Sequence, residues 1–166
     1  RQRQMCIRDR YIANATGCAQ AMFLSVPSIP MVKDSAGHGP ALSNSLFENN
    51  AEYSLGMCLS VDQQRNQVKT HAKAALDTTS DAALKAALES WLQDGDDGDK
   101  TRAVSDALIA ALEKCEQTED VSYILENREY LSKKSIWAIG GDGWAYDIGF
   151  GGIDHVMAPN RDVNLL

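Results

Sequence analysis

The tripeptide Gly141-Asp142-Gly143 places a carboxylate between two glycines, one residue after the apolar run SIWAI. Glycines let a phosphate group approach the backbone closely, and the N–H groups that open a following helix favour an anion. A carboxylate among phosphates would be repelled unless a cation lay between them, and Mg²⁺ commonly bridges carboxylate and phosphate oxygens. The tripeptide therefore indicates a metal-bound diphosphate. One alternative is a dinucleotide-binding motif, but its glycine pattern would need a glycine at the position of Tyr146. The other alternative is a tight turn with a solvent-exposed aspartate.

Three other features could carry chemistry. Cys18 follows a turn of small residues, where it could ligate a cluster, act as a reactive thiol or fill the core as a small hydrophobic residue. Trp144 follows the glycine turn directly and would either line a cofactor pocket or belong to the core. Residues 94–99, DGDDGD, resemble a calcium loop, but the glutamate required at its twelfth position falls on Ser105, so a polar turn is the better interpretation.

The elements around the glycine turn predict a parallel sheet. Residues 135–140 have the pattern of a buried strand, residues 145–158 that of a helix with one apolar face, and residues 163–166 that of a further strand. A strand, a turn, a helix and a strand in this order predict an α/β fold with a parallel sheet flanked by helices. Ligands of such sheets bind beyond the carboxyl ends of the strands, which is where residues 141–143 would lie.

Helices are expected between the cysteine and the glycine turn, after a loop over residues 19–40. One helix should begin near residue 44 and continue through the polar stretch 62–76, and a short helix is expected over residues 121–131. Two alanine-rich helices between them carry apolar residues at helical spacing. These residues are Leu84, Leu88, Trp91 and Leu92 in the first, and Val104, Leu108, Leu112 and Cys115 in the second. We interpret residues of about 77–131 as a helical insertion rather than a catalytic centre.

The N-terminal segment needs separate treatment. MCIRDR has the sequence that the end of a transposon-type sequencing adaptor would encode, so we interpret residues 1–10 as a library artefact; a natural basic arm is the alternative. Without this segment the net charge changes from −7 to −10, which makes a nucleic-acid surface unexpected. The end of the chain on RDVNLL, inside an apolar run, suggests a fragment cut at both ends.

Composition limits the class of protein. The chain has 166 residues, of which 44% are hydrophobic, enough for a packed core. No window reaches the roughly 18 apolar residues of a membrane helix, and no signal peptide is recognisable. The cysteines outside the N-terminal segment show no CxxC spacing, which is typical of a reducing, cytoplasmic environment rather than of a disulfide framework.

Three blocks of sequence together resemble one enzyme family. IANATGC (12–18), GPALSNSLFENNAE (39–52) and IGGDGWAYDIGFGGIDHV (139–156) are similar, in this order, to the C-terminal part of pyruvate:ferredoxin (flavodoxin) oxidoreductase. The resemblance covers nearly all of residues 11–166 and implies that they form an incomplete thiamine-diphosphate-binding domain. Departures from the family pattern are the residues Phe23, Leu24, Leu42 and Asn49, and they put the choice of substrate in doubt.

The resemblance also implies roles for single residues. Asp142 would bind the Mg²⁺ of thiamine diphosphate, in a turn shaped by Gly141 and Gly143. Cys18 would supply one of four ligands of the [4Fe–4S] cluster nearest the thiamine. The last two cofactor-binding residues implied are Phe47, near the thiazolium ring, and Trp144.

The implied parent enzyme decarboxylates a 2-oxoacid, pyruvate above all, to CO₂ and acetyl-CoA. Its partners would be coenzyme A, ferredoxin or flavodoxin, the other domains of the same enzyme and a second subunit in a homodimer. The remaining cluster ligands would lie outside the fragment, which alone should be inactive. Two alternatives stay open: a thiamine-diphosphate enzyme without a cluster, in which Cys18 belongs to the core, and a non-enzymatic interaction module built on the helices of residues 84–115.

Overall fold

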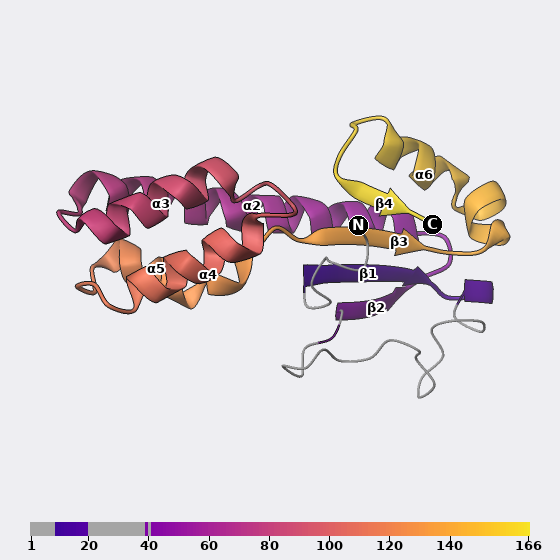
Figure 1. The fold of residues 1–166 in the computed structure, drawn as a ribbon. Helices are drawn as coiled ribbons and strands as arrows, with labels where there is room; N and C mark the ends of the chain where they lie inside the picture. Colours follow the sequence, from indigo (N-terminus) through magenta and orange to yellow (C-terminus); the bar gives the residue numbers. More distant parts are fainter. Residues whose placement is uncertain (1–8, 20–38, 40) are drawn as a thin grey trace. The chain divides into compact units, whose positions relative to one another are not determined.

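A computed structural model describes residues 9–19, 39 and 41–166, which form two compact units (Figure 1). The sheet unit comprises Cys6–Ser60 and Lys134–Leu166, and the helical unit comprises Val61–Lys133. Most of the loop predicted over residues 19–40 lies outside the described residues.

The sheet unit is built on four parallel strands (Figure 1). The strands are β1 (Arg10–Ala15), β2 (Ala41–Ser45), β3 (Ser135–Ile139) and β4 (Val163–Leu165). Their spatial order is β2-β1-β3-β4. The prediction of an α/β fold with a parallel sheet flanked by helices is confirmed, and β1 and β3, which bear the predicted site, are the central strands.

Strand β2 was not predicted, and the prediction of a helix that begins near residue 44 is wrong. Asn44 and Ser45 end β2, and α2 (Asn50–Thr78) begins only at Asn50. The sequence ALSNS is short and polar, without the alternation of a half-buried strand. It is extended because it pairs with β1 from Tyr11↔Ala41 to Ala15↔Ser45, a tertiary contact that overrides local propensity.

The helix predicted over residues 145–158 is interrupted. A π-helical segment, η3 (Trp144–Ile148), precedes α6 (Phe150–Met157), and Asp147 between them has non-helical angles of φ −129° and ψ −107°. Three glycines follow within five residues, and glycine is a poor helix former. The chain between β3 and β4 therefore forms two short helical segments instead of one continuous helix.

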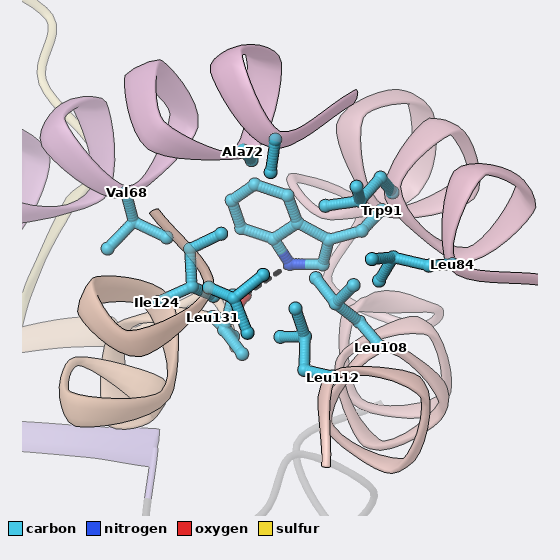
Figure 2. Packing of buried hydrophobic residues seen from close by; sticks show 11 residues of the cluster. Val68, Ala72, Leu84, Trp91, Leu108, Leu112, Ile124 and Leu131 are labelled. Atoms are coloured by element: carbon cyan, nitrogen blue, oxygen red, sulfur yellow. Dashed lines mark hydrogen bonds between the residues drawn. The ribbon is translucent and has the colours of Figure 1, made fainter. Parts of the chain in front are cut away.

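The helical unit confirms the predicted apolar faces. Its helices after α2 are α3 (Ala82–Asp94), α4 (Thr101–Leu112) and α5 (Glu119–Glu126), followed by the short 3₁₀ helix η2 (Arg128–Tyr130). Buried residues from all four α-helices surround Trp91 (Figure 2). Cys115 is the exception to the predicted pattern, because α4 ends at Leu112 and the thiol lies in the turn that follows.

A buried arginine, Arg65, connects segments of the helical unit that are distant in sequence. The guanidinium of Arg65 donates to the carbonyls of Tyr130 (2.6 Å), Leu131 (3.0 Å) and Gly95 (3.0 Å), and it pairs with Asp96 (2.9 Å). The indole N–H of Trp91 donates to the same Leu131 carbonyl (Figure 2). We call Arg65 and these acceptors the Arg65 clamp.

The last two residues of the segment 1–10 take part in the sheet unit. Arg10 opens β1, and Asp9 forms a buried ion pair with Lys134 at 3.1 Å. The assignment of the segment to an adaptor stays a prediction, as does the extent of the helical insertion. Among the residues that the structure describes, no helix is both long and apolar enough to cross a membrane.

Candidate functional site

The predicted site residues Cys18 and Gly141-Asp142-Gly143 follow the carboxyl ends of β1 and β3, which are neighbouring strands. Strand β2 lies beside β1 at one edge of the sheet, and β4 lies beside β3 at the other edge. The connections that follow β1 and β3 therefore run in opposite directions along the sheet. Such a reversal opens a crevice between the two strands, which is where open α/β sheets bind ligands. Cys18 lies just beyond β1, and Gly141-Asp142-Gly143 lies just beyond β3.

Cys18 lies directly against the glycine turn. A β-carbon added at Gly141 would be 3.1 Å from Cβ of Cys18 and 3.8 Å from its Sγ. A side chain at position 141 would therefore press on the cysteine. The two candidates, which are distant in sequence, are neighbours in the structure.

Phe47 packs between two glycine turns. A β-carbon at Gly143 would lie 2.6 Å from Cζ of the ring, and one at Gly17 would lie 3.1 Å from its Cε2. Gly17 also has φ +153°, in a region that residues with side chains rarely adopt. The ring, from the loop between β2 and α2, thus joins the turn after β1 to the turn after β3. These glycines are needed for packing within the protein, a role beyond the phosphate approach expected from the sequence.

Asp142 is exposed beside this packed group. Among the described residues, no group of three or more His, Cys, Asp and Glu could hold a metal ion. Mg²⁺ takes oxygen ligands and is usually bound by one or two carboxylates together with phosphate oxygens and water. A single exposed carboxylate on a glycine turn fits that donor set, and it does not fit a metal cage made of protein side chains alone.

Cys18 is the exposed cysteine among those described. Cys58 is buried in α2, and Cys115 is half-buried in the helical unit. Burial raises the pKa of the Cys115 thiol above its ordinary value, which lowers its reactivity. One exposed thiol beside the glycine turn fits a single ligand of a cluster, whose other ligands must come from residues outside the described set.

Trp144 is buried, with 2% of its surface exposed. β-carbons at Gly140 and Gly149 would collide with its indole ring, so the ring is enclosed by its own loop. It packs in a core cluster with Ala15, Ala51, Ala138 and Val156. Its Nε1 is buried without a hydrogen-bond partner among the described residues. The geometry is that of a core residue beneath the turn, and contact with a cofactor stays a prediction.

A buried polar network under the site was not predicted. Asn50, the first residue of α2, is fully buried; its amide accepts from Ser45 Oγ (2.7 Å) and donates to the carbonyl of Ile139 (3.2 Å). Asn14 donates from its side chain to Asn44 (3.0 Å). Asparagine and serine at strand ends are typical of turns as well, so the sequence carried no signal that separates this network from an exposed loop.

Curated relatives match this chain closely. It is 46% identical to the pyruvate:ferredoxin oxidoreductase of Moorella thermoacetica and 47% identical to the pyruvate-flavodoxin oxidoreductase of Enterobacter agglomerans, over 93% of its length in both cases. The chain belongs, as a segment, to this family of pyruvate oxidoreductases. It spans 14% of the length of each of these two relatives.

The names of the relatives differ in the electron acceptor. The matching protein of Euglena gracilis, 40% identical over 93% of the chain, is named mitochondrial pyruvate dehydrogenase [NADP(+)]. Pyruvate is common to the three names, whereas ferredoxin, flavodoxin and NADP(+) alternate in them. No protein-family model matches the chain.

Proposed function

We propose that this chain is the thiamine-diphosphate-binding segment of a cytoplasmic 2-oxoacid:ferredoxin or flavodoxin oxidoreductase that converts pyruvate and coenzyme A to acetyl-CoA and CO₂. The carrying observation is the close approach of Cys18 to Gly141, since it puts the proposed cluster ligand beside the proposed diphosphate turn. The pyruvate named in the relatives supports the substrate. The other domains and a second subunit would complete the enzyme.

In this proposal, each residue has a task of its own. Asp142 holds the Mg²⁺ of the diphosphate, and the backbone of Gly141 and Gly143 forms the turn beside it. Phe47 fills the space between the turns and keeps water from it. When bound, thiamine diphosphate supplies the electron-accepting ring for decarboxylation.

Cys18 would place the nearest cluster beside the diphosphate turn. A cluster held there would supply one-electron redox chemistry, and burial and hydrogen bonds to its sulfur atoms would set its potential. Ferredoxin, flavodoxin or another carrier would accept the electrons in the end. The choice among these carriers rests on parts of the parent enzyme that this chain does not cover.

The test uses the intact parent enzyme, recovered by sequencing the gene beyond both ends of this chain. A CxxC pair upstream, with an asparagine and a further cysteine downstream, is expected. Asp142→Asn should weaken binding of magnesium thiamine diphosphate, measured by calorimetry, by more than about 100-fold, because even outer-shell partners of a metal contribute about 10–100-fold. The matched control is Asp154→Asn, an exposed aspartate of α6, which should bind as the wild type does.

Three results would contradict the proposal in different ways. An intact wild-type enzyme that binds no magnesium thiamine diphosphate would refute the cofactor, and equal binding by Asp142→Asn would refute the role of that residue. Cys18→Ser should lower the iron content and the pyruvate-dependent reduction of a viologen dye. Unchanged iron would leave a thiamine-diphosphate enzyme in which Cys18 belongs to the core.

A further inference from the structure

We propose that Asn50 is a positioning residue of the diphosphate turn, an inference that rests on the proposed function. Asn50 is fully buried and opens α2, while the turn follows β3, far along the chain. Its side-chain N–H donates to the carbonyl of Ile139, the last residue of β3. The residues Gly140 and Gly141 follow at once, and then Asp142.

The peptide between Ile139 and Gly140 is fixed from both sides. Its C=O accepts from Asn50 Nδ2 at 3.2 Å, and its N–H donates to the carbonyl of Leu166 beside β4 at 3.0 Å. C=O and N–H of a trans peptide point in opposite directions within one plane. Two anchors on opposite sides therefore prevent rotation of this plane, and the plane sets the direction in which the chain enters the glycine turn.

Asn50 is itself held in place. Ser45 Oγ, at the end of β2, donates to Asn50 Oδ1 at 2.7 Å. Ser45 is paired with Ala15 of β1, and Asn14 of β1 is paired with Ile139. The amide of Asn50 thus connects the carboxyl ends of β2 and β3, on either side of β1, and holds together the strand ends that carry the turn and the cysteine.

The chemistry of this position requires an amide. One end must accept a hydrogen bond from Ser45 and the other must donate to a carbonyl, which an ionised carboxylate cannot do. Asn50→Asp would keep the shape and the bond from Ser45 but would place a negative charge against the Ile139 carbonyl. Asn50→Leu would keep a similar volume and remove both bonds.

The experiment compares these variants in the intact parent enzyme, freed of cofactor. Calorimetry gives the dissociation constants of magnesium pyrophosphate and of magnesium thiamine diphosphate, and thermal unfolding of the apoenzyme gives stability. Both substitutions should weaken both ligands by a similar factor, about 10–100-fold as for other outer-shell partners. The control is Asn66→Ala, an exposed asparagine on the same helix, which should change neither constant.

Pyrophosphate isolates the turn from the rest of the cofactor, and the dissociation constant separates positioning from stability. A purely structural residue would lower the unfolding temperature and the fraction of active sites, while the folded fraction kept its affinity. Should both Asn50 variants fail to fold, Ser45→Ala decides, because it keeps the bond to Ile139 and frees Asn50 at its other end; weaker pyrophosphate binding is expected, and wild-type affinity would overturn the role.

The two proposals fail differently. Wild-type enzyme that binds both ligands, with folded Asn50 variants that bind them equally well, would overturn the positioning role alone. Wild-type enzyme that binds neither ligand would overturn the proposed function, and the positioning role would fall with it.

Discussion

The helical unit and the sheet unit bury different kinds of side chain. The buried cluster of the helical unit consists mostly of large apolar residues around Trp91 (Figure 2), whereas the cluster around Trp144 in the sheet unit contains three alanines and Val156. Ile12 and Ile136 are also buried in the sheet unit. Burial of a large aliphatic or aromatic side chain contributes about 1.5–3 kcal/mol and that of an alanine much less. The cluster of the helical unit therefore buries more large apolar side chains, and the sheet unit carries the candidate site.

Polar groups reinforce the contrast. In the Arg65 clamp, the two Nη atoms of Arg65 donate to carbonyls and to a carboxylate of the helical unit. In the sheet unit, Asn14 Oδ1 and Trp144 Nε1 are buried without partners among the described residues. Large apolar side chains are also exposed after the glycine turn, up to 84% for Tyr146.

The largest effect is expected from breaking the Arg65 clamp. Arg65→Met would leave the carbonyls of Tyr130 and Gly95 without this donor, and each buried polar group left unsatisfied costs about 1–3 kcal/mol. Urea unfolding of the chain, followed by far-UV circular dichroism, should show this loss in the helical transition. Lys69→Met is the control: its partner Asp96 is exposed, so the loss should stay below about 1 kcal/mol. Equal losses in the two variants would show that the clamp is no stronger than a surface pair.

A smaller effect is expected where the sheet unit is tightly packed. Gly143→Ala would place a methyl group 2.6 Å from the ring of Phe47, and overpacking of this kind costs about 1–3 kcal/mol. Phe47→Leu in the same chain should recover part of that loss in urea unfolding. Gly56→Ala, in open space on α2, is the matched control and should stabilise by about 0.5–1 kcal/mol. A Gly143→Ala chain as stable as wild type would mean that Phe47 moves freely and does not join the turns.

The smallest effect concerns pH and the helical unit alone. Burial raises the pKa of Asp96, but the hydrogen bonds from Lys69 and Arg65 outweigh it and hold the pKa below the ordinary value of 3.8. The folded state thus binds its proton less readily than the unfolded state, so the contribution is complete above the unfolded pKa and is lost as the pH falls through the folded pKa. Asp96 is mostly exposed, which keeps the contribution to about 1 kcal/mol or less.

Unfolding curves measured from about pH 6 down into the acid range, which includes the ordinary pKa of aspartate, would measure the contribution of Asp96 to the free energy of unfolding. Wild type and Asp96→Asn should differ at the upper end and converge as the carboxyl becomes protonated. A difference that grows toward low pH would have the wrong sign and would exclude the ion pair as its source.

Local patterns predicted the helical unit well. Leu84, Leu88 and Trp91 fall on one face because a helix repeats every 3.6 residues, and that face is buried. The strand before Gly141 was equally visible as an apolar run. The pairing of β1 with β3, the long-range contact that brings Cys18 to this turn, was not predicted.

Long-range contacts account for what the sequence did not reveal. Strand β2 exists through pairing with β1, and the burial of Asn50 and Arg65 depends on carbonyls distant in the chain. A polar letter in a sequence does not say whether its partner is water or a buried backbone group. The break at Asp147 was hidden for a related reason, because apolar spacing continued across it.

The Arg65 clamp also bears on the order in which the chain folds. Strands β1 and β3 are neighbours, but nearly the whole helical unit is synthesised between them, and such distant pairings form slowly. The bond from Arg65 to Leu131 joins residues 66 positions apart, near the two ends of that unit. A helical unit that folds first, as its local contacts favour, shortens the loop that the sheet must close, and each halving of such a loop saves about 0.6 kcal/mol of closure entropy. During synthesis on the ribosome, a helical unit that has already folded would shorten the distance that β3 must cover to pair with β1, which is synthesised earlier.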